Sequence, residues 1–496
     1  MSRKAIVIGA GFGGLAAAIR LQSMGLSVTL LEGRARPGGR AYVYEQDGFT
    51  FDAGPTVITD PSSLEELFEL SGRRLSDYVE LLPITPFYRL LWEDGTAFDY
   101  VNDQAELDRQ IAALSPPDVA GYRRFLDYST QVFEEGYLKL GHVAFLDPWS
   151  MVKAAPQLAR LQAWRSVYSM VSSFVQEEHL RQALSFHTLL VGGNPFQSSS
   201  IYALIHALER KWGVWFPRGG TGALVAGLAR LFQDLGGTLR LATPAAEILT
   251  QGDRAVGVRT EDGEVLMADL VVSNADVMHT YGKLLKRHPR GRRMEKGLGR
   301  RRFSMSLFVV YFGLKRRHDD LRHHTILFGP EYKGLVDSIC GAKPLREDFS
   351  IYLHAPSVTD DSLAPHGCSA YYALSPVPNL TQPIDWQTEG PKYAERLLEA
   401  IERRAIPGLR EDLVTMRIFT PEDFQSELNA HLGSAFSLEP ILTQSAWFRV
   451  HNRDAEVRNL YFVGAGTHPG AGVPGVVGSA KATARVIAED LAREPA

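Results

Sequence analysis

The chain has 496 residues, with 53 Lys and Arg against 57 Asp and Glu, and a formal net charge of −4. This length exceeds what one hydrophobic core supports, so we expect at least two domains. The near-neutral charge gives no reason to expect a nucleic-acid partner. Two cysteines, Cys340 and Cys368, form neither a disulfide framework nor a CxxC pair nor a zinc set, which indicates a reducing compartment.

The sequence predicts no membrane-spanning segment. Arg3 and Lys4 precede an apolar run over 5–19 that resembles a signal peptide, but four glycines interrupt it and no cleavage site follows. The longest other apolar run, 304–314, falls short of the ~18 residues that a spanning helix needs. Contact with a membrane surface remains possible.

The first elements in chain order form a βαβ unit. Residues 5–9 predict a short strand, 14–25 a helix that ends at Gly25, and 26–32 a second strand. Short connections of this kind imply parallel strands in an α/β sheet.

The turn between the first strand and the helix reads Gly9-Ala10-Gly11-Phe12-Gly13-Gly14. Glycine suits the tight turn, the close approach of the backbone to a pyrophosphate, and helix–strand packing. The phosphates would lie at the helix N-terminus. Glu32 ends the second strand, where a carboxylate accepts hydrogen bonds from ribose hydroxyls and would repel the 2′-phosphate of NADP.

A second glycine-rich turn follows at once, Arg36-Pro37-Gly38-Gly39-Arg40. Arg40 would neutralise phosphate, and Gly38 and Gly39 would admit the chain close to the cofactor. A plain NAD enzyme has no use for this element, so the pair of turns predicts a flavin dinucleotide.

The middle of the chain alternates in character. Residues 105–212 are mostly helical in pattern, a helix is expected over 223–235, and strands are expected over 238–273, with a hairpin turn at 261–263. Residues 303–375 also read as strand-rich.

The chain ends with a strand over 459–466, a glycine-rich loop and a helix over about 475–492. Pro474 lies just before this helix, where a missing N–H is tolerated. The helix N-terminus around Gly475 and Val476 would point at the flavin and favour negative charge there.

These elements predict a mixed α/β fold with a discontinuous Rossmann-like FAD-binding domain, made of 1–80, 215–282 and 452–496. Residues 101–214 are predicted to form a helical, membrane-facing subdomain. A β-sheet substrate-binding domain would comprise 81–100 and 283–451.

With these motifs in place, the chain resembles the bacterial phytoene desaturases, within the FAD-dependent amine oxidase-like superfamily. The likeness spans nearly the whole chain: 8–15, Glu32, 38–40, 51–56, 189–195, 215–220 and 459–480. The C-terminal stretch carries the more specific motif. The cofactor contacts assigned from the motifs and the resemblance together are Gly9, Gly11, Phe12, Gly13, Gly14, Glu32, Gly38, Gly39, Arg40, Gly54, Pro55, Thr56, Gly466, Thr467, Val473, Pro474, Gly475 and Val476.

The resemblance implies FAD as the cofactor and a long polyene such as phytoene as the substrate. The reaction would be repeated desaturation toward lycopene or a partly desaturated relative, on the cytoplasmic face of the cell membrane. No second strand-led GxGxxG offers an NAD(P)H site, so oxygen or a quinone is expected to accept the electrons. No catalytic side chain is assigned, and the number of steps, the carotenoid length and the oligomeric state stay open.

Three alternatives remain at this point. One is another FAD oxidase acting on an amine or a porphyrinogen, and a second is a flavin-dependent carotenoid isomerase. The third, from a different class, is a non-catalytic prenyl-lipid carrier; the intact glycine motifs argue against it.

The 14 histidines suggest no metal site, because adjacent His323 and His324 are expected to diverge and His187, His206, His354 and His468 are scattered. Of these, His468 is expected nearest the flavin. Residues 283–303 hold ten Lys or Arg and are expected to be a solvated loop, with lipid contact as the alternative.

The better membrane candidate is 151–175, whose apolar positions recur at helical spacing alongside three basic residues and no acid. Packing of this helix on its own domain is the equal alternative. The apolar positions are Leu158, Leu161, Trp164, Tyr168, Val171 and Val175, and the basic ones are Lys153, Arg160 and Arg165.

Overall fold

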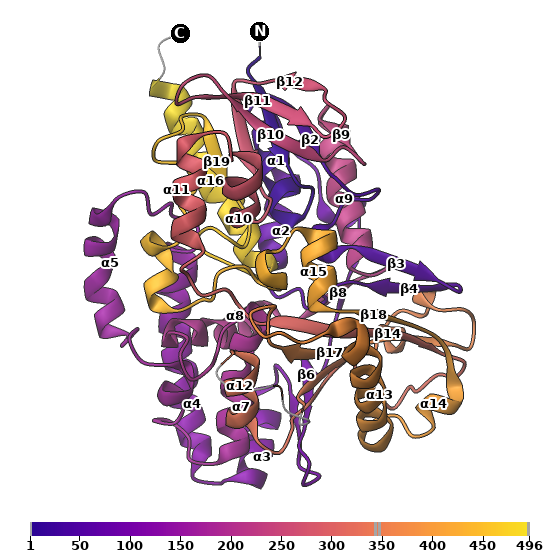
Figure 1. The fold of residues 1–496 in the computed structure, drawn as a ribbon. Helices are drawn as coiled ribbons and strands as arrows, with labels where there is room; N and C mark the ends of the chain where they lie inside the picture. The colour runs from indigo at the N-terminus through magenta and orange to yellow at the C-terminus, as the bar shows by residue number, and fades with distance from the viewer. Residues whose placement is uncertain (1, 342–344, 346–348, 494–496) are drawn as a thin grey trace.

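A five-stranded parallel sheet gathers strands from both ends and the middle of the chain (Figure 1). The computed structural model describes residues 2–341, 345 and 349–493. The strands lie in the order β19-β13-β1-β2-β9 and comprise Leu460–Phe462, Leu270–Ser273, Lys4–Ile8, Ser27–Leu31 and Thr238–Arg240. The discontinuous Rossmann-like arrangement is confirmed.

Helices α1 (Phe12–Ser23), α9 (Thr221–Asp234) and α16 (Val473–Arg493) pack on this sheet and on one another. The small residues of α1 allow the close approach, since Ala16, Ala17 and Ala18 are all buried. One polar group in this core is Arg20, which pairs with Glu66 of α2 (Pro61–Glu69) at 3.0 Å.

A three-stranded antiparallel sheet follows α9 in the chain. It is formed by β10 (Ala245–Thr250), β11 (Ala255–Thr260) and β12 (Val265–Met267). The turn between β11 and β12 contains Gly263, whose φ of +92° favours glycine. The hairpin expected at 261–263 is therefore present.

A seven-stranded sheet lies in the lower half of the view in Figure 1. Its order is β18-β14-β17-β16-β15-β6-β7, comprising Leu413–Phe419, Ser306–Leu314, Ser369–Val377, Ile351–His354, His324–Leu327, Tyr88–Leu91 and Ala97–Tyr100. β14 is buried on both faces, which explains its unbroken apolar run. Phe308 packs toward α13 (Trp386–Arg404), whereas Leu307 and Tyr311 face a separate aromatic cluster.

The segment between β7 and β8 (Trp215–Pro217) in the chain is mostly helical, as expected. Its α-helices are α3 (Gln104–Leu114), α4 (Asp118–Val132), α5 (Pro148–Arg160), α6 (Val167–Val171), α7 (Glu178–Ser185) and α8 (Leu204–Trp212). In Figure 1, α5 projects at the margin of the molecule.

The expectation of one amphipathic helix over 151–175 is wrong. The chain leaves α5 after Arg160, turns through Gln162 with φ of +52°, and resumes as the short α6. Leu161, Val171 and Val175 are consequently buried, whereas Trp164 is 64% exposed. The six apolar positions therefore do not form one face.

The remaining strands and α-helices are short and connect these layers. They are β3 (Val43–Gln46), β4 (Phe49–Asp52), β5 (Leu81–Pro83), β8 (Trp215–Pro217), α10 (Val277–His279), α11 (Pro289–Leu298), α12 (Tyr332–Ile339), α14 (Leu409–Asp412) and α15 (Pro421–Leu428). Among the described residues, no helix combines the length and the apolar character needed to cross a bilayer.

Candidate active site

A single continuous cavity of about 840 Å³ runs from the parallel sheet to the seven-stranded sheet. Loops at the carboxyl ends of β1, β2 and β13 and the start of α16 line one end, here called the dinucleotide half. Side chains of β6, β15, β16, β17 and α8 line the other, the apolar half. Ligands in open α/β sheets bind outside the carboxyl ends of the strands, where the dinucleotide half lies.

Most of the residues assigned to the cofactor from sequence line this cavity. They are Gly9, Gly11, Phe12, Gly13, Glu32, Gly38, Gly39, Arg40, Gly54, Pro55, Thr56, Val473, Pro474, Gly475 and Val476. Gly14, Gly466 and Thr467 lie behind its wall. Thr467 is fully buried and bonds Ser479 Oγ at 2.6 Å, so it supports the loop from within.

The first glycine turn has the geometry that its sequence predicts. Gly9 has φ of +92°, and a Cβ at Gly14 would lie 1.8 Å from the Gly9 carbonyl oxygen. Helix α1 starts beside the cavity with no side-chain cap and no acid in its first turn. Its free N–H groups are therefore available to an anion.

Glu32 closes one side of this turn. Its Oε2 accepts a hydrogen bond from the Ala10 N–H at 2.8 Å, and its Oε1 accepts one from the Arg34 N–H at 2.9 Å. Each carboxylate oxygen has a second lone pair, so Glu32 can hold the loop and still accept from a ligand hydroxyl.

Arg40 is a half-buried cation whose buried Nε can still donate a hydrogen bond. Its Nη2 donates to the Ser434 carbonyl at 3.3 Å, while its Nε has no hydrogen-bond partner. Burial lowers the pKa of the guanidinium, and the nearby Asp276 carboxylate opposes this shift. A buried, unpaired N–H on this cation beside the glycine turns fits a phosphate oxygen.

The sequence reasoning missed the loop after β13. Asn274 Nδ2 donates to the Gly9 carbonyl at 3.2 Å, and Asn274 Oδ1 lies where a Cβ on Gly13 or Gly464 would come within 2.6 Å. Asn274 thus joins two glycine loops, 9–14 and the one that begins at Gly464, and Asp276 near it lines the cavity. The available signal was the position directly after a parallel strand.

Helix α16 begins at Val473, two residues earlier than expected, so Pro474 lies within its first turn. Proline is well suited there because its missing N–H needs no partner. The first turn contains no acid and lines the cavity, as does His468. The His468 Nε2 bonds the Leu140 carbonyl at 2.8 Å, and burial lowers its pKa to about 4, so the ring is a neutral part of the wall.

These observations show that the dinucleotide half fits FAD. It offers two helix N-termini free of acids, a half-buried arginine with a buried, unpaired N–H, and a carboxylate at the end of β2.

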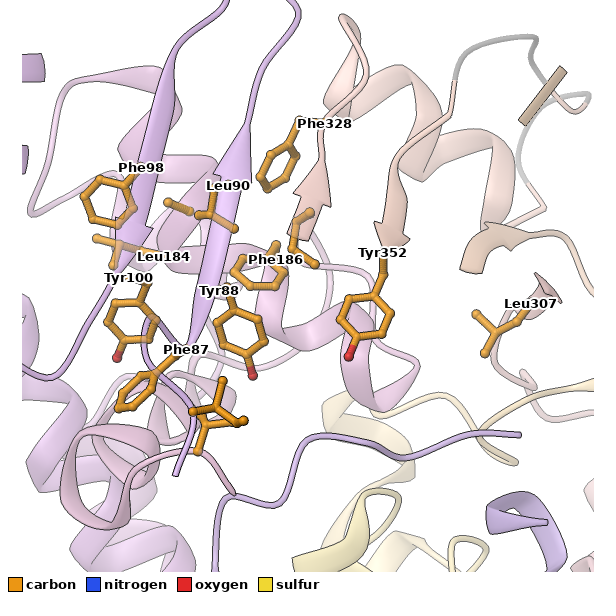
Figure 2. Close-up of a cluster of buried hydrophobic side chains, with 14 of the residues drawn as sticks. Phe87, Tyr88, Leu90, Phe98, Tyr100, Leu184, Phe186, Leu307, Phe328 and Tyr352 are labelled. Atoms are coloured by element: carbon orange, nitrogen blue, oxygen red, sulfur yellow. The ribbon is translucent and has the colours of Figure 1, made fainter. Parts of the chain in front are cut away.

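The apolar half is built from aromatic and aliphatic side chains. Figure 2 shows three of them: Tyr88 of β6, Tyr352 of β16, and Phe186, which follows α7. The hydroxyls of both tyrosines point the same way. The Tyr88 and Phe186 rings lie 5.6 Å apart, edge to face. Ile326, Phe328 and Leu374 extend the same lining. This half suits a long hydrocarbon.

One buried polar cluster interrupts the apolar lining. Glu209 of α8 is fully buried, accepts a hydrogen bond from the Tyr88 hydroxyl at 2.7 Å, and lies 3.1 Å from His187 Nε2. Both Tyr88 and Glu209 line the cavity. A single sequence gave no signal for this cluster, because Tyr88 and Glu209 are 121 positions apart.

Residues of α5 and of 442–446 line one end of the cavity, and because α5 lies at the margin of the molecule (Figure 1) this end is taken as the mouth. Met151 and Leu158 of α5 line it together with Leu442, which is 40% exposed. Around it, Trp149 is 70% and Val152 57% exposed on α5. α5 packs against the turn 446–448, where Phe448 is 41% exposed. Trp149, Val152, Leu442, Phe448 and the nearby Trp164 are called the mouth patch below.

The basic segment 283–303 is largely tied to acids elsewhere. Arg287 pairs with Glu247 at 3.0 Å, and Arg290 pairs with Asp454 at 3.2 Å. These pairs favour an ion-paired surface over lipid contact, but the expectation of a loop is wrong, because 289–298 form α11 (Pro289–Leu298).

The expectation that His323 and His324 diverge is wrong. Strand β15 starts only at His324, so side-chain alternation does not separate the two rings, and their centroids lie 4.5 Å apart. His354 of β16 lies opposite His324 in the paired strands and completes the group. Burial lowers the pKa of His323 to about 3 and holds those of His324 and His354 well below the usual value.

Comparison with known proteins identifies the class. The family model described as flavin containing amine oxidoreductase matches residues 12–488. An oxidoreductase from Methanosarcina mazei of known structure has the same fold, with a TM-score of 0.65 at 18% identity over 98% of this chain and 100% of that one.

Closer relatives narrow the family. A phytoene desaturase (lycopene-forming) from Pantoea ananas is 63% identical over 98% of this chain and 99% of its own length. A phytoene desaturase (neurosporene-forming) from Cereibacter sphaeroides is 46% identical over 97% and 94%. The chain belongs to the flavin containing amine oxidoreductases and, within them, to the phytoene desaturases. It is an FAD-dependent oxidoreductase.

Proposed function

We propose that this protein desaturates a phytoene-like polyene, with FAD in the dinucleotide half of the cavity and the hydrocarbon in the apolar half. The observation that carries the proposal is the continuity of the two halves within one cavity. The 63% identity to a lycopene-forming enzyme supports lycopene as the main product.

The residues of the dinucleotide half would hold the cofactor. The α1 N-terminus and Arg40 would bind the pyrophosphate, Glu32 the ribose hydroxyls, and the first turn of α16 the flavin ring. When bound, FAD supplies the acceptor for the two electrons that leave an unactivated CH–CH pair.

The apolar half binds and orients the substrate. A hydrocarbon offers no charge, so its binding rests on apolar contact worth about 25 cal/mol per Å² buried. Tyr88, Phe186 and Tyr352 are bulky, restrict the path of the chain and exclude water. Beside this path the Glu209 carboxylate accepts the Tyr88 hydroxyl, and its Oε2 lies 3.1 Å from His187 Nε2.

We further propose that the mouth patch lies on an anionic membrane surface, the cytoplasmic face in the cell. The substrate is insoluble in water, and exposed apolar side chains lie on α5 and near it, where Met151 and Leu158 of α5 line the cavity. Exposed Lys153 and Arg160 on α5 add positive charge, each worth about 1 kcal/mol near anionic lipid.

The predicted domain division accords with this function and remains part of the proposal. The segments 1–80, 215–282 and 452–496 would bind FAD, 101–214 would face the membrane, and 81–100 with 283–451 would complete the substrate site. Oxygen or a quinone is proposed as the final electron acceptor.

The proposal is tested by producing the protein in a host that accumulates phytoene, followed by pigment analysis. We expect phytoene to be replaced by lycopene or a less desaturated relative. Unchanged phytoene in the presence of FAD-loaded protein contradicts the proposal. Turnover of an amine or a porphyrinogen would support the superfamily alternative, and altered double-bond geometry alone would support the isomerase alternative.

A further inference from the structure

The histidine trio, His323, His324 and His354, lies behind the wall of the apolar half. All three side chains are buried, at 4%, 0% and 1% exposure. Antiparallel pairing of β15 with β16 places His324 directly opposite His354. The ring of His323 lies 4.8 Å from that of His354, and one nitrogen from each ring falls within 4.8 Å of the other two.

Four of the six ring nitrogens in the trio have no hydrogen-bond partner. His323 Nδ1 bonds Thr359 Oγ1 at 2.7 Å, and His324 Nδ1 bonds the Tyr352 hydroxyl at 2.6 Å. His323 Nε2, His324 Nε2 and both nitrogens of His354 are buried and unpaired. Buried polar atoms are nearly always satisfied, so this cluster requires an explanation.

A chain of hydroxyls determines which nitrogen of His324 carries the proton. The Tyr372 hydroxyl must donate to the Gly54 carbonyl at 3.1 Å, because a carbonyl cannot donate. Thr56 must then donate to Tyr372 at 2.8 Å, and Tyr352 to Thr56 at 2.9 Å.

The Tyr352 oxygen is therefore left to accept from the Nδ1–H of His324. The lone pair of His324 consequently lies on Nε2, which is buried and has no hydrogen-bond partner. A metal-binding histidine has this arrangement, since its second ring nitrogen donates to an oriented oxygen.

We propose that the histidine trio binds one divalent first-row transition ion of the Zn²⁺ type. Three neutral imidazoles suit such an ion, and three protein ligands leave a fourth position for water. The ion would satisfy the unpaired nitrogens and tie β15 to β16. Through His324 it would fix Tyr352, which lines the cavity.

The site is distinct from the cavity and independent of the proposed desaturation. The Phe216 ring packs 4.6 Å from His323 and 5.5 Å from His354 and shields the trio on one side. The carboxylates of Asp52 and Asp360 lie close enough to influence this region electrostatically, and they would offset part of the added charge.

The test uses tag-free, FAD-loaded protein produced with Zn²⁺ in the medium. Elemental analysis after gel filtration should find about one zinc per chain, and X-ray absorption should show three imidazole nitrogens at about 2.0–2.1 Å. Protein that is folded and FAD-loaded, but holds no zinc and takes up none after chelator treatment and Zn²⁺ addition, overturns the proposal.

Two variants and one control assign the site. His354→Gln should lose the zinc, and Tyr352→Phe should weaken zinc binding by about tenfold or more, because the oxygen that accepts from His324 Nδ1 is removed while all three ligands stay. His206→Gln is the matched control, since His206 is also buried with an unpaired Nδ1 but lies outside the trio, and it should keep the zinc. Equal zinc in wild type and His354→Gln places the ion elsewhere and overturns the proposal. If His354→Gln does not fold, the X-ray absorption of the wild type decides.

Discussion

Individual residues of the glycine turns leave room for the cofactor. At Gly11, an added Cβ would lie 3.2 Å from Asn274 Nδ2, which would have to shift, and a larger side chain would also enter the cavity. Gly11→Val should weaken FAD binding by about 1–3 kcal/mol or more through overpacking. Flavin content per purified chain measures this. Gly297→Val is the control, because Gly297 on α11 faces open space. Equal flavin content in the two variants would refute the assignment of this loop.

Glu32 is expected to bind the adenosine ribose. Glu32→Ala should raise the Kd for FAD, with a loss of binding free energy of about 1–3 kcal/mol, the usual value for a charge-assisted hydrogen bond. Because Glu32 also accepts from the backbone at Ala10 and Arg34, the Tm of the flavin-free variant is measured in parallel. An unchanged Kd would remove Glu32 from the site.

Glu209 satisfies the buried Tyr88 hydroxyl in the apolar half and lies beside the buried His187 ring. Its replacement by alanine leaves the Tyr88 hydroxyl unpaired and His187 without its acid, so Glu209→Ala should destabilise the fold by about 1–3 kcal/mol. Thermal unfolding measures the change. Glu65→Ala, at an exposed position of α2, is the control. The same Tm in both variants would show that the cluster contributes nothing.

At the scale of elements, α5 is expected to contact lipid. Changing Trp149, Val152 and Trp164 together to serine should reduce binding to anionic liposomes while FAD content stays normal, because all three are exposed. High salt should weaken wild-type binding without abolishing it, since the apolar part is unaffected by salt. Serine at Val265 and Met267, exposed on β12, is the matched control. Normal liposome binding by the triple variant would place the membrane contact elsewhere.

The same scale shows what could be predicted from sequence. β1, α1 and β2 were predicted within a few residues, because their periodicity and glycine turns are local signals. The single helix expected over 151–175 is wrong, because the helical spacing of apolar residues continues through a turn. In the structure the chain reverses at Gln162, whose φ is +52°. The loop at Asn274, the Glu209 cluster and the histidine trio depend on strand pairing and packing between distant segments, which one sequence does not reveal.

At the scale of the whole molecule, one cavity joins the dinucleotide half to the apolar half, and this continuity is the central claim. It is tested most directly by incubating FAD-loaded protein with phytoene in anionic liposomes without oxygen or quinone. The account predicts that loss of phytoene stops after about one two-electron oxidation per bound FAD and resumes when an acceptor is added. Phytoene that stays unchanged while FAD is bound, or conversion that proceeds in FAD-free protein, would contradict it.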